Sequence, residues 1–156
     1  MDKRALHAEL IARLEAELAA MERAHQSTVA GMTHEQAKPE NDKDTRALEQ
    51  GYLARGQAQR VEELRVAVGE TKAMTLRTFA EDAPIGVSAL VTYEDERGEQ
   101  RAFVTMHGGG ETLSGGVKVV TTLSPLGRAL VGKCVGDDAE LVQAGKTRTL
   151  SILTVT

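Results

Sequence analysis

The sequence is poor in aromatic residues, in cysteine and in long apolar runs, and each shortage excludes a class of protein. Its 156 residues include two Tyr, two Phe and no Trp, too few rings for a platform that stacks single-stranded nucleic acid. A single cysteine, Cys134, excludes an internal disulfide and a cysteine-cluster zinc site. No apolar run approaches the ~18 residues of a membrane span or resembles a signal peptide, so we expect a cytoplasmic protein that does not contact membrane.

Charge and length set further bounds. The chain has 19 Lys+Arg against 23 Asp+Glu, a formal charge of −4, which excludes a protein that binds nucleic acid by phosphate neutralisation alone. Its length allows one domain or two small ones. Composition changes near residue 75: Ala, Leu, Glu and Arg dominate before it, whereas most Gly, Val and Thr follow it. The sequence therefore predicts a helical segment, residues 1–75, and a β-rich domain, residues 76–156.

The helical segment has an apolar repeat that alternates spacings of three and four residues, as a coiled-coil seam does. The first run consists of Ile11, Leu14, Leu18 and Met21, extended by His7, His25, Thr28 and Met32, and the second of Ala54, Gln57, Val61, Leu64 and Val68. Between them Pro39 breaks the helix, and Asn41, Asp42 and Asp44 favour a turn. A heptad seam also permits dimerisation, but a central break favours pairing within one chain. We expect an antiparallel two-helix hairpin in a monomer.

The second segment predicts an α+β module, an antiparallel sheet with one short helix. The expected strands are Gly86–Tyr93, Arg101–Met106, Val117–Leu123, Ala139–Gln143 and Thr147–Val155. Ser124 is placed to cap a helix that has Pro125 at its first position. The run from Gly108 to Gly116 predicts a flexible connector between strands. We expect Cys134 to be a small packed or partly exposed thiol and not a nucleophile.

The run from Val120 to Asp137 resembles the C-terminal signature of the bacterial Gre transcript-cleavage factors, the GreA/GreB-like family. That signature is Ser-Pro-(apolar)-(Gly/Ala)-Arg-Ala-Leu-(apolar)-Gly-Lys followed by Gly-Asp. The matching residues are Ser124, Pro125, Gly127, Arg128, Ala129, Leu130, Gly132, Lys133, Gly136 and Asp137. The last two strands and the segment from Arg60 to Leu64 resemble the family as well.

The resemblance implies a coiled-coil hairpin with an acidic tip and a C-terminal FKBP-like domain. In that family the FKBP-like domain docks at the rim of the secondary channel of RNA polymerase. The hairpin enters the channel, where tip carboxylates help to hold the second Mg²⁺ while the polymerase cleaves backtracked RNA. Such a protein has no catalytic residues of its own, binds no cofactor stably and contacts the nascent RNA only indirectly. The tip candidates are Glu40, Asp42 and Asp44; the expected contacts with the polymerase are Ser124, Pro125, Arg128, Gly132 and Lys133.

The tip departs from the family pattern, which commonly reads Asp-Leu-Lys-Glu-Asn-Ala-Glu-Tyr. An ungapped alignment from Arg60 places Glu40 at the first acid and Lys43 at the second, and a shift of one residue brings Asp44 there. A regulator or inhibitor that binds the same channel without stimulating cleavage therefore stays open. Two further alternatives also stay open: a regulator of nucleoside-diphosphate kinase with a related fold, and a prolyl isomerase. A prolyl isomerase needs a pocket with more aromatic rings than Phe79, Tyr93 and Phe103 supply.

Overall fold

The computed structural model describes residues 1–36 and 44–156, with the side chains of residues 34–36 and 44 outside that description. The chain divides into two compact units: Ala12–Gly69, and Met1–Ile11 together with Glu70–Thr156. The boundaries of these units differ from those of the predicted segments, 1–75 and 76–156. The start of the first helix and the end of the second group with the sheet. Within the described ranges, the helices all fall short of the length and apolarity needed to cross a membrane.

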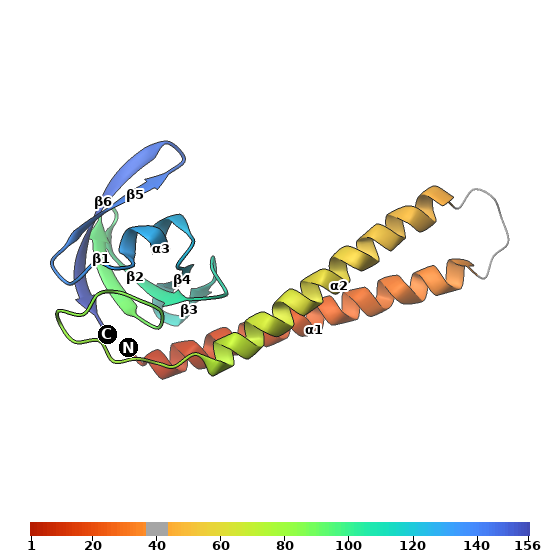
Figure 1. The fold of residues 1–156 in the computed structure, drawn as a ribbon, viewed down its shortest axis with the longest axis horizontal. Helices are drawn as coiled ribbons and strands as arrows, with labels where there is room; N and C mark the ends of the chain where they lie inside the picture. The colour runs from red at the N-terminus through yellow and green to blue at the C-terminus, as the bar shows by residue number, and fades with distance from the viewer. Residues whose placement is uncertain (37–43) are drawn as a thin grey trace. The chain divides into compact units, whose positions relative to one another are not determined.

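Two long helices form the predicted hairpin. Helix α1 spans Lys3–Gln36 and α2 spans Asp44–Ala73, and the two run antiparallel (Figure 1). In the unit Ala12–Gly69, Leu14, Val61 and Leu64 are buried where the repeat predicts a seam. Arg60 Nη2 donates to Glu17 Oε1 at 2.7 Å, but both side chains are exposed, so this ion pair contributes little. The apolar seam is therefore what holds the hairpin together.

A six-stranded sheet forms the body of the other unit, and the predicted fold class is confirmed. Its strands are β1 (Leu90–Asp95), β2 (Gly98–Thr105), β3 (Thr112–Leu113), β4 (Val117–Thr121), β5 (Asp138–Gln143) and β6 (Lys146–Val155). They lie in the order β3-β4-β2-β1-β6-β5. All neighbours are antiparallel except β2 and β4, so the sheet is mixed where the sequence predicts an antiparallel one.

Two local predictions are wrong for reasons that lie far away in the chain. The segment from Gly86 to Tyr93 becomes a strand only at Leu90, because Ser88 adopts a φ of 72° and its Oγ accepts a hydrogen bond from Arg77 N at 2.9 Å. The expected connector Gly108–Gly116 contains β3 and a short 3₁₀ turn. There Ser114 N donates to Glu9 Oε2 at 3.0 Å, a contact that a sequence pattern does not reveal.

Helix α3 (Pro125–Leu130) covers one end of one face of the sheet, and its start is built as predicted (Figure 1). The Ser124 hydroxyl accepts from Gly127 N at 3.1 Å and donates to the Thr121 carbonyl at 2.8 Å. Gly127 lies so close to β4 that an added Cβ would fall 1.8 Å from the same Thr121 oxygen. Only glycine allows this approach, and it brings Leu130 into the core formed with β1, β2, β5 and β6.

Gly127→Ala is therefore expected to destabilise the protein by at least about 2 kcal/mol, because backbone must move to admit the methyl group. Gly56→Ala is the control: this glycine in α2 has no atom near its Cβ position, and alanine is the better helix former by roughly 1 kcal/mol. Urea denaturation followed by circular dichroism should lower the midpoint for the first variant and leave or raise it for the second. Equal midpoints would contradict the close approach of α3.

Candidate functional site

The sheet face that carries α3 changes from apolar to polar along its strands. On β1 the side chains of this face run from Val91 through Tyr93 to Asp95, because alternate residues share a face. The polar positions on the neighbouring strands are Gln100 on β2, Lys118 on β4, Gln143 on β5 and Arg148 on β6. Leu130 of α3 packs over the apolar end. The short helix therefore leaves the polar end of the face uncovered.

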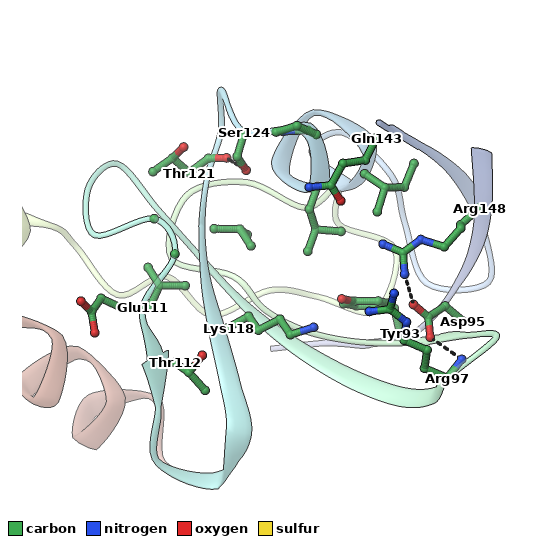
Figure 2. A pocket seen from close by; sticks show the side chains of 17 residues that line it. Tyr93, Asp95, Arg97, Glu111, Thr112, Lys118, Thr121, Ser124, Gln143 and Arg148 are labelled. Carbon is green, nitrogen blue, oxygen red and sulfur yellow. Dashed lines mark hydrogen bonds and ion pairs between the residues drawn. The ribbon is translucent and has the colours of Figure 1, made fainter. Parts of the chain in front are cut away.

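A pocket of about 590 Å³ occupies this uncovered region, within the unit that contains the sheet (Figure 2). We call it the sheet pocket. Apolar side chains line its α3 end and charged ones its other end. Its lining consists of Tyr93, Asp95, Arg97, Gly109, Gly110, Glu111, Thr112, Lys118, Val119, Val120, Thr121, Ser124, Pro125, Leu126, Leu141, Gln143 and Arg148.

A buried carboxylate organises the charged end. The Asp95 side chain is only 5% exposed and that of Arg148 is 20% exposed. Arg148 Nη1 donates to Asp95 Oδ2 at 3.5 Å, and Arg97 N donates to Asp95 Oδ1 at 2.8 Å. One carboxylate thus fixes both the β1–β2 turn and the guanidinium on β6, as the dashed lines in Figure 2 show.

Two further side chains define the chemistry of this end. Burial raises the pKa of the Tyr93 phenol, with the Asp95 charge a smaller cause in the same direction. Lys118 extends toward the Tyr93 side of the pocket (Figure 2), and its Nζ donates to Gln100 Oε1 at 3.4 Å. The result is a neutral phenol surrounded by cations, with Asp95 already occupied by its own hydrogen bonds. Such an arrangement suits non-covalent binding of an anionic group.

The structure brings only part of the predicted contact set to this pocket. Ser124 and Pro125 line it, whereas Arg128 is exposed on α3 and is not part of the lining. Gly132 and Lys133 instead hold the loop before β1: Gly132 N donates to Ile85 O at 2.9 Å, and Ile85 N donates to Lys133 O at 2.8 Å. The signature thus includes residues that position α3 as well as residues at the pocket.

Sequence reasoning missed the charged end of the pocket. Tyr93, Asp95, Lys118 and Arg148 stand outside the signature, and Asp95 and Arg148 are 53 positions apart. Each strand does contain a sequence signal. Alternate residues are apolar, and the next residue on the same face is charged, which marks the edge of a core. That signal finds the residues separately but does not show that they meet.

The predicted metal-facing residues Glu40 and Asp42 lie outside the described residues, as does the side chain of Asp44. Within the part of the chain that the structure describes, His, Cys, Asp and Glu side chains form no group of three or more that could hold a metal ion. The prediction that the tip carboxylates face Mg²⁺ therefore stays a prediction.

Comparison by sequence matches the C-terminal part of the chain to a described family. Residues 81–156 match the family model described as "Transcription elongation factor, GreA/GreB, C-term". A search of curated proteins finds no match.

Among solved structures, similar chains include GreA factor homolog 1 (Gfh1) of Thermus thermophilus, at 17% identity and a TM-score of 0.41 over 94% of each chain. Gfh1 of Thermus aquaticus is 18% identical, with a TM-score of 0.39 over 92% of this chain and 91% of that one. The elongation factor GreA/GreB of Nitrosomonas europaea is 19% identical, with a TM-score of 0.39 over 62% of this chain and 78% of that one. At these sequence identities and TM-scores, the similarity to solved structures says nothing about the function of this chain.

The raised pKa of Tyr93 has a measurable consequence. In a Tyr52→Phe background Tyr93 is the remaining tyrosine, and its absorbance should titrate above the unfolded value of about 10. The folded phenol keeps its proton where the unfolded one has lost it, so the free energy of unfolding should fall as pH rises above about 10. Adding Asp95→Asn should lower the titration midpoint. A midpoint equal to that of the urea-unfolded chain would contradict the burial of the phenol.

Proposed function

We propose that the chain is a member of the GreA/GreB family of transcription elongation factors, whose C-terminal model residues 81–156 match, and that it acts on bacterial RNA polymerase as an accessory factor. Its C-terminal domain docks on the polymerase at the rim of the secondary channel, and its helical hairpin enters that channel. The observation that carries the proposal is the family match over residues 81–156. A two-helix hairpin precedes that domain in the chain.

The docking surface on this chain is the sheet pocket together with the start of α3. Ser124 and Pro125 stand at the pocket, and Leu126 contributes an apolar side chain beside them. The Ser124 cap fixes the first turn of α3 through its bonds to Gly127 N and Thr121 O. A partner therefore meets a preformed rim, which lowers the ordering cost of binding.

At the other end of the chain, the tip residues have the chemistry that Mg²⁺ requires. Glu40, Asp42 and Asp44 place three carboxylates within five residues, and hard oxygen ligands suit this ion. When bound at the polymerase active site, the ion neutralises phosphate charge and activates water. The part of this chain is to present the carboxylates on a narrow two-helix support.

A second function is favoured by one residue. Lys43 stands where the ungapped alignment with the family tip places the second acid, and a cation at that place opposes metal binding. The alternative is a regulator that occupies the same channel and inhibits the polymerase without stimulating cleavage. Both functions share the docking step and differ in what the tip does.

RNA cleavage in halted elongation complexes tests the proposal. The wild-type chain should accelerate cleavage, and the triple variant Glu40→Ala, Asp42→Ala, Asp44→Ala should lose at least about tenfold of that acceleration, the low end of losses for groups that support a metal site. The matched control Glu40→Asp, Asp42→Glu, Asp44→Glu keeps every charge and should retain part of it.

Three outcomes separate the alternatives. Binding with cleavage that depends on the tip supports the proposal. Binding of the wild type without any acceleration contradicts cleavage and favours the inhibitory regulator. Failure of the wild type to bind RNA polymerase contradicts both functions.

A further inference from the structure

The charged end of the sheet pocket continues into a second hollow at the tips of two hairpins. This hollow, of about 580 Å³, adds Glu96, Ala144, Lys146 and Thr147 to the shared residues Arg97, Gln143 and Arg148. Because the two hollows share these three lining residues, we treat them as one groove that runs from α3 to the β1–β2 and β5–β6 turns. We call it the sheet groove.

The lining of the sheet groove has a small excess of positive charge, in a chain that is acidic overall. The two hollows together are lined by four bases, Arg97, Lys118, Lys146 and Arg148, against three acids, Asp95, Glu96 and Glu111, whereas the whole chain has a formal charge of −4. Like charges gathered at one place repel one another, and an anionic partner removes that repulsion. The local excess of positive charge therefore indicates an anionic ligand.

Arg148 is the best placed of these bases to recognise a specific group. The buried Asp95 carboxylate holds its guanidinium through a single contact at 3.5 Å, and a guanidinium has five N–H donors. A side chain that is 20% exposed has already lost much of its freedom, so a ligand that binds it has little ordering left to impose. A carboxylate matches such a preset fork.

The other end of the sheet groove requires an apolar group. Val120, Leu126 and Leu141 line it, next to Pro125 at the start of α3. One ligand that satisfies both ends has an apolar side chain for the α3 end and a carboxylate for Arg148. A polypeptide segment offers that combination, whereas a nucleic-acid backbone offers only phosphates.

Two more observations disfavour nucleic acid as the occupant. Glu111 lines the sheet pocket and Glu96 lines the hairpin end, so a continuous phosphate backbone would pass two carboxylates. Tyr93 is the only ring in the lining of either hollow and is 3% exposed, which leaves no platform on which bases stack. A protein segment with spaced acids avoids both costs.

We propose that the sheet groove receives a segment of the polymerase that pairs an apolar side chain at the α3 end with a carboxylate bound by Arg148, which Asp95 holds in place. This inference rests on the proposed function for the identity of the partner and adds the chemistry by which that partner is recognised. In it Arg148 is a contact residue, and Asp95 is a positioning residue that acts through it.

Substitution at Arg148 tests the inference. Arg148→Gln is expected to weaken binding to RNA polymerase core enzyme about tenfold or more, as loss of a charge-assisted hydrogen bond does, and to reduce the salt dependence of binding. Arg101→Gln makes the same change of charge at a position that lines neither hollow and should leave both unchanged. Because Arg148→Gln leaves Asp95 buried without its cation, a thermal melt accompanies it. Lys146→Gln, at an exposed residue, provides a second variant, expected to weaken binding about twofold to threefold.

Carbodiimide, which joins an amine to an adjacent carboxylate with loss of water, identifies the partner group. Treatment of the complex should link Lys118 or Lys146 to an Asp or Glu of the polymerase, and the Arg148→Lys variant should add a link at position 148. The corresponding Arg101→Lys variant should add none at position 101. Mass spectrometry of the linked peptides reads out each site.

The outcomes distinguish this inference from the proposed function. If the wild type binds polymerase while Arg148→Gln and Lys146→Gln bind with unchanged affinity and salt dependence, the inference is wrong and docking stands. If a single-stranded RNA 20-mer or duplex DNA binds the chain and loses affinity on Arg148→Gln while polymerase binding does not, the groove takes nucleic acid and the inference is overturned. If the wild type does not bind polymerase, the proposed function itself fails.

Discussion

The contact between Gly127 and the Thr121 carbonyl sets the geometry on which the rest of this molecule depends. A six-residue helix has few side chains with which to hold its place, so its backbone lies directly on β4. From there Leu130 closes the apolar core, and the helix ends before it reaches the charged residues of the same face. A longer helix, or one held farther away by a Cβ, would not leave this pocket at this place.

Unpaired charges at the open end of the face would destabilise the fold, and the hydrogen bonds of Asp95 offset most of that free-energy cost. Asp95 is an acceptor for the β1–β2 turn and for Arg148 at once, so a buried carboxylate is hydrogen-bonded on both oxygens. The same bonds orient a guanidinium toward the groove. Stability and recognition are therefore coupled at one residue, which is why we treat Asp95 as a positioning residue and not as a ligand contact.

The two ends of the chain have separate chemical tasks in this account. The described domain presents cations and an apolar rim suited to a protein surface, whereas the tip sequence presents carboxylates suited to a metal ion. The family match covers residues 81–156 and so supports the docking half more strongly than the cleavage half. In the proposal, Lys43 is the residue that separates an inhibitor from a cleavage factor.

Much of the fold could be predicted from local pattern. The three-four spacing gave both helices because a coiled-coil seam is a property of sequence neighbours, and the Ser124 cap was visible because its hydrogen bond spans three residues. What local pattern missed depends on partners that are distant in sequence. The regular structure of Gly108–Gly116 is held in part by Glu9, which lies 105 positions from its partner Ser114. The start of β1 at Leu90 depends on the hydrogen bond from Arg77 N to Ser88 Oγ.

Localised radical cleavage of the chain bound to a halted RNA polymerase tests the central claim most directly. With Fe²⁺ in place of Mg²⁺ at the polymerase active site, hydroxyl radicals cut only the polypeptide that lies close to the ion. The account predicts cuts confined to the tip, around residues 37–44, and none in residues 81–156. A bound chain that is cut in the sheet domain, or not cut at all, would contradict it.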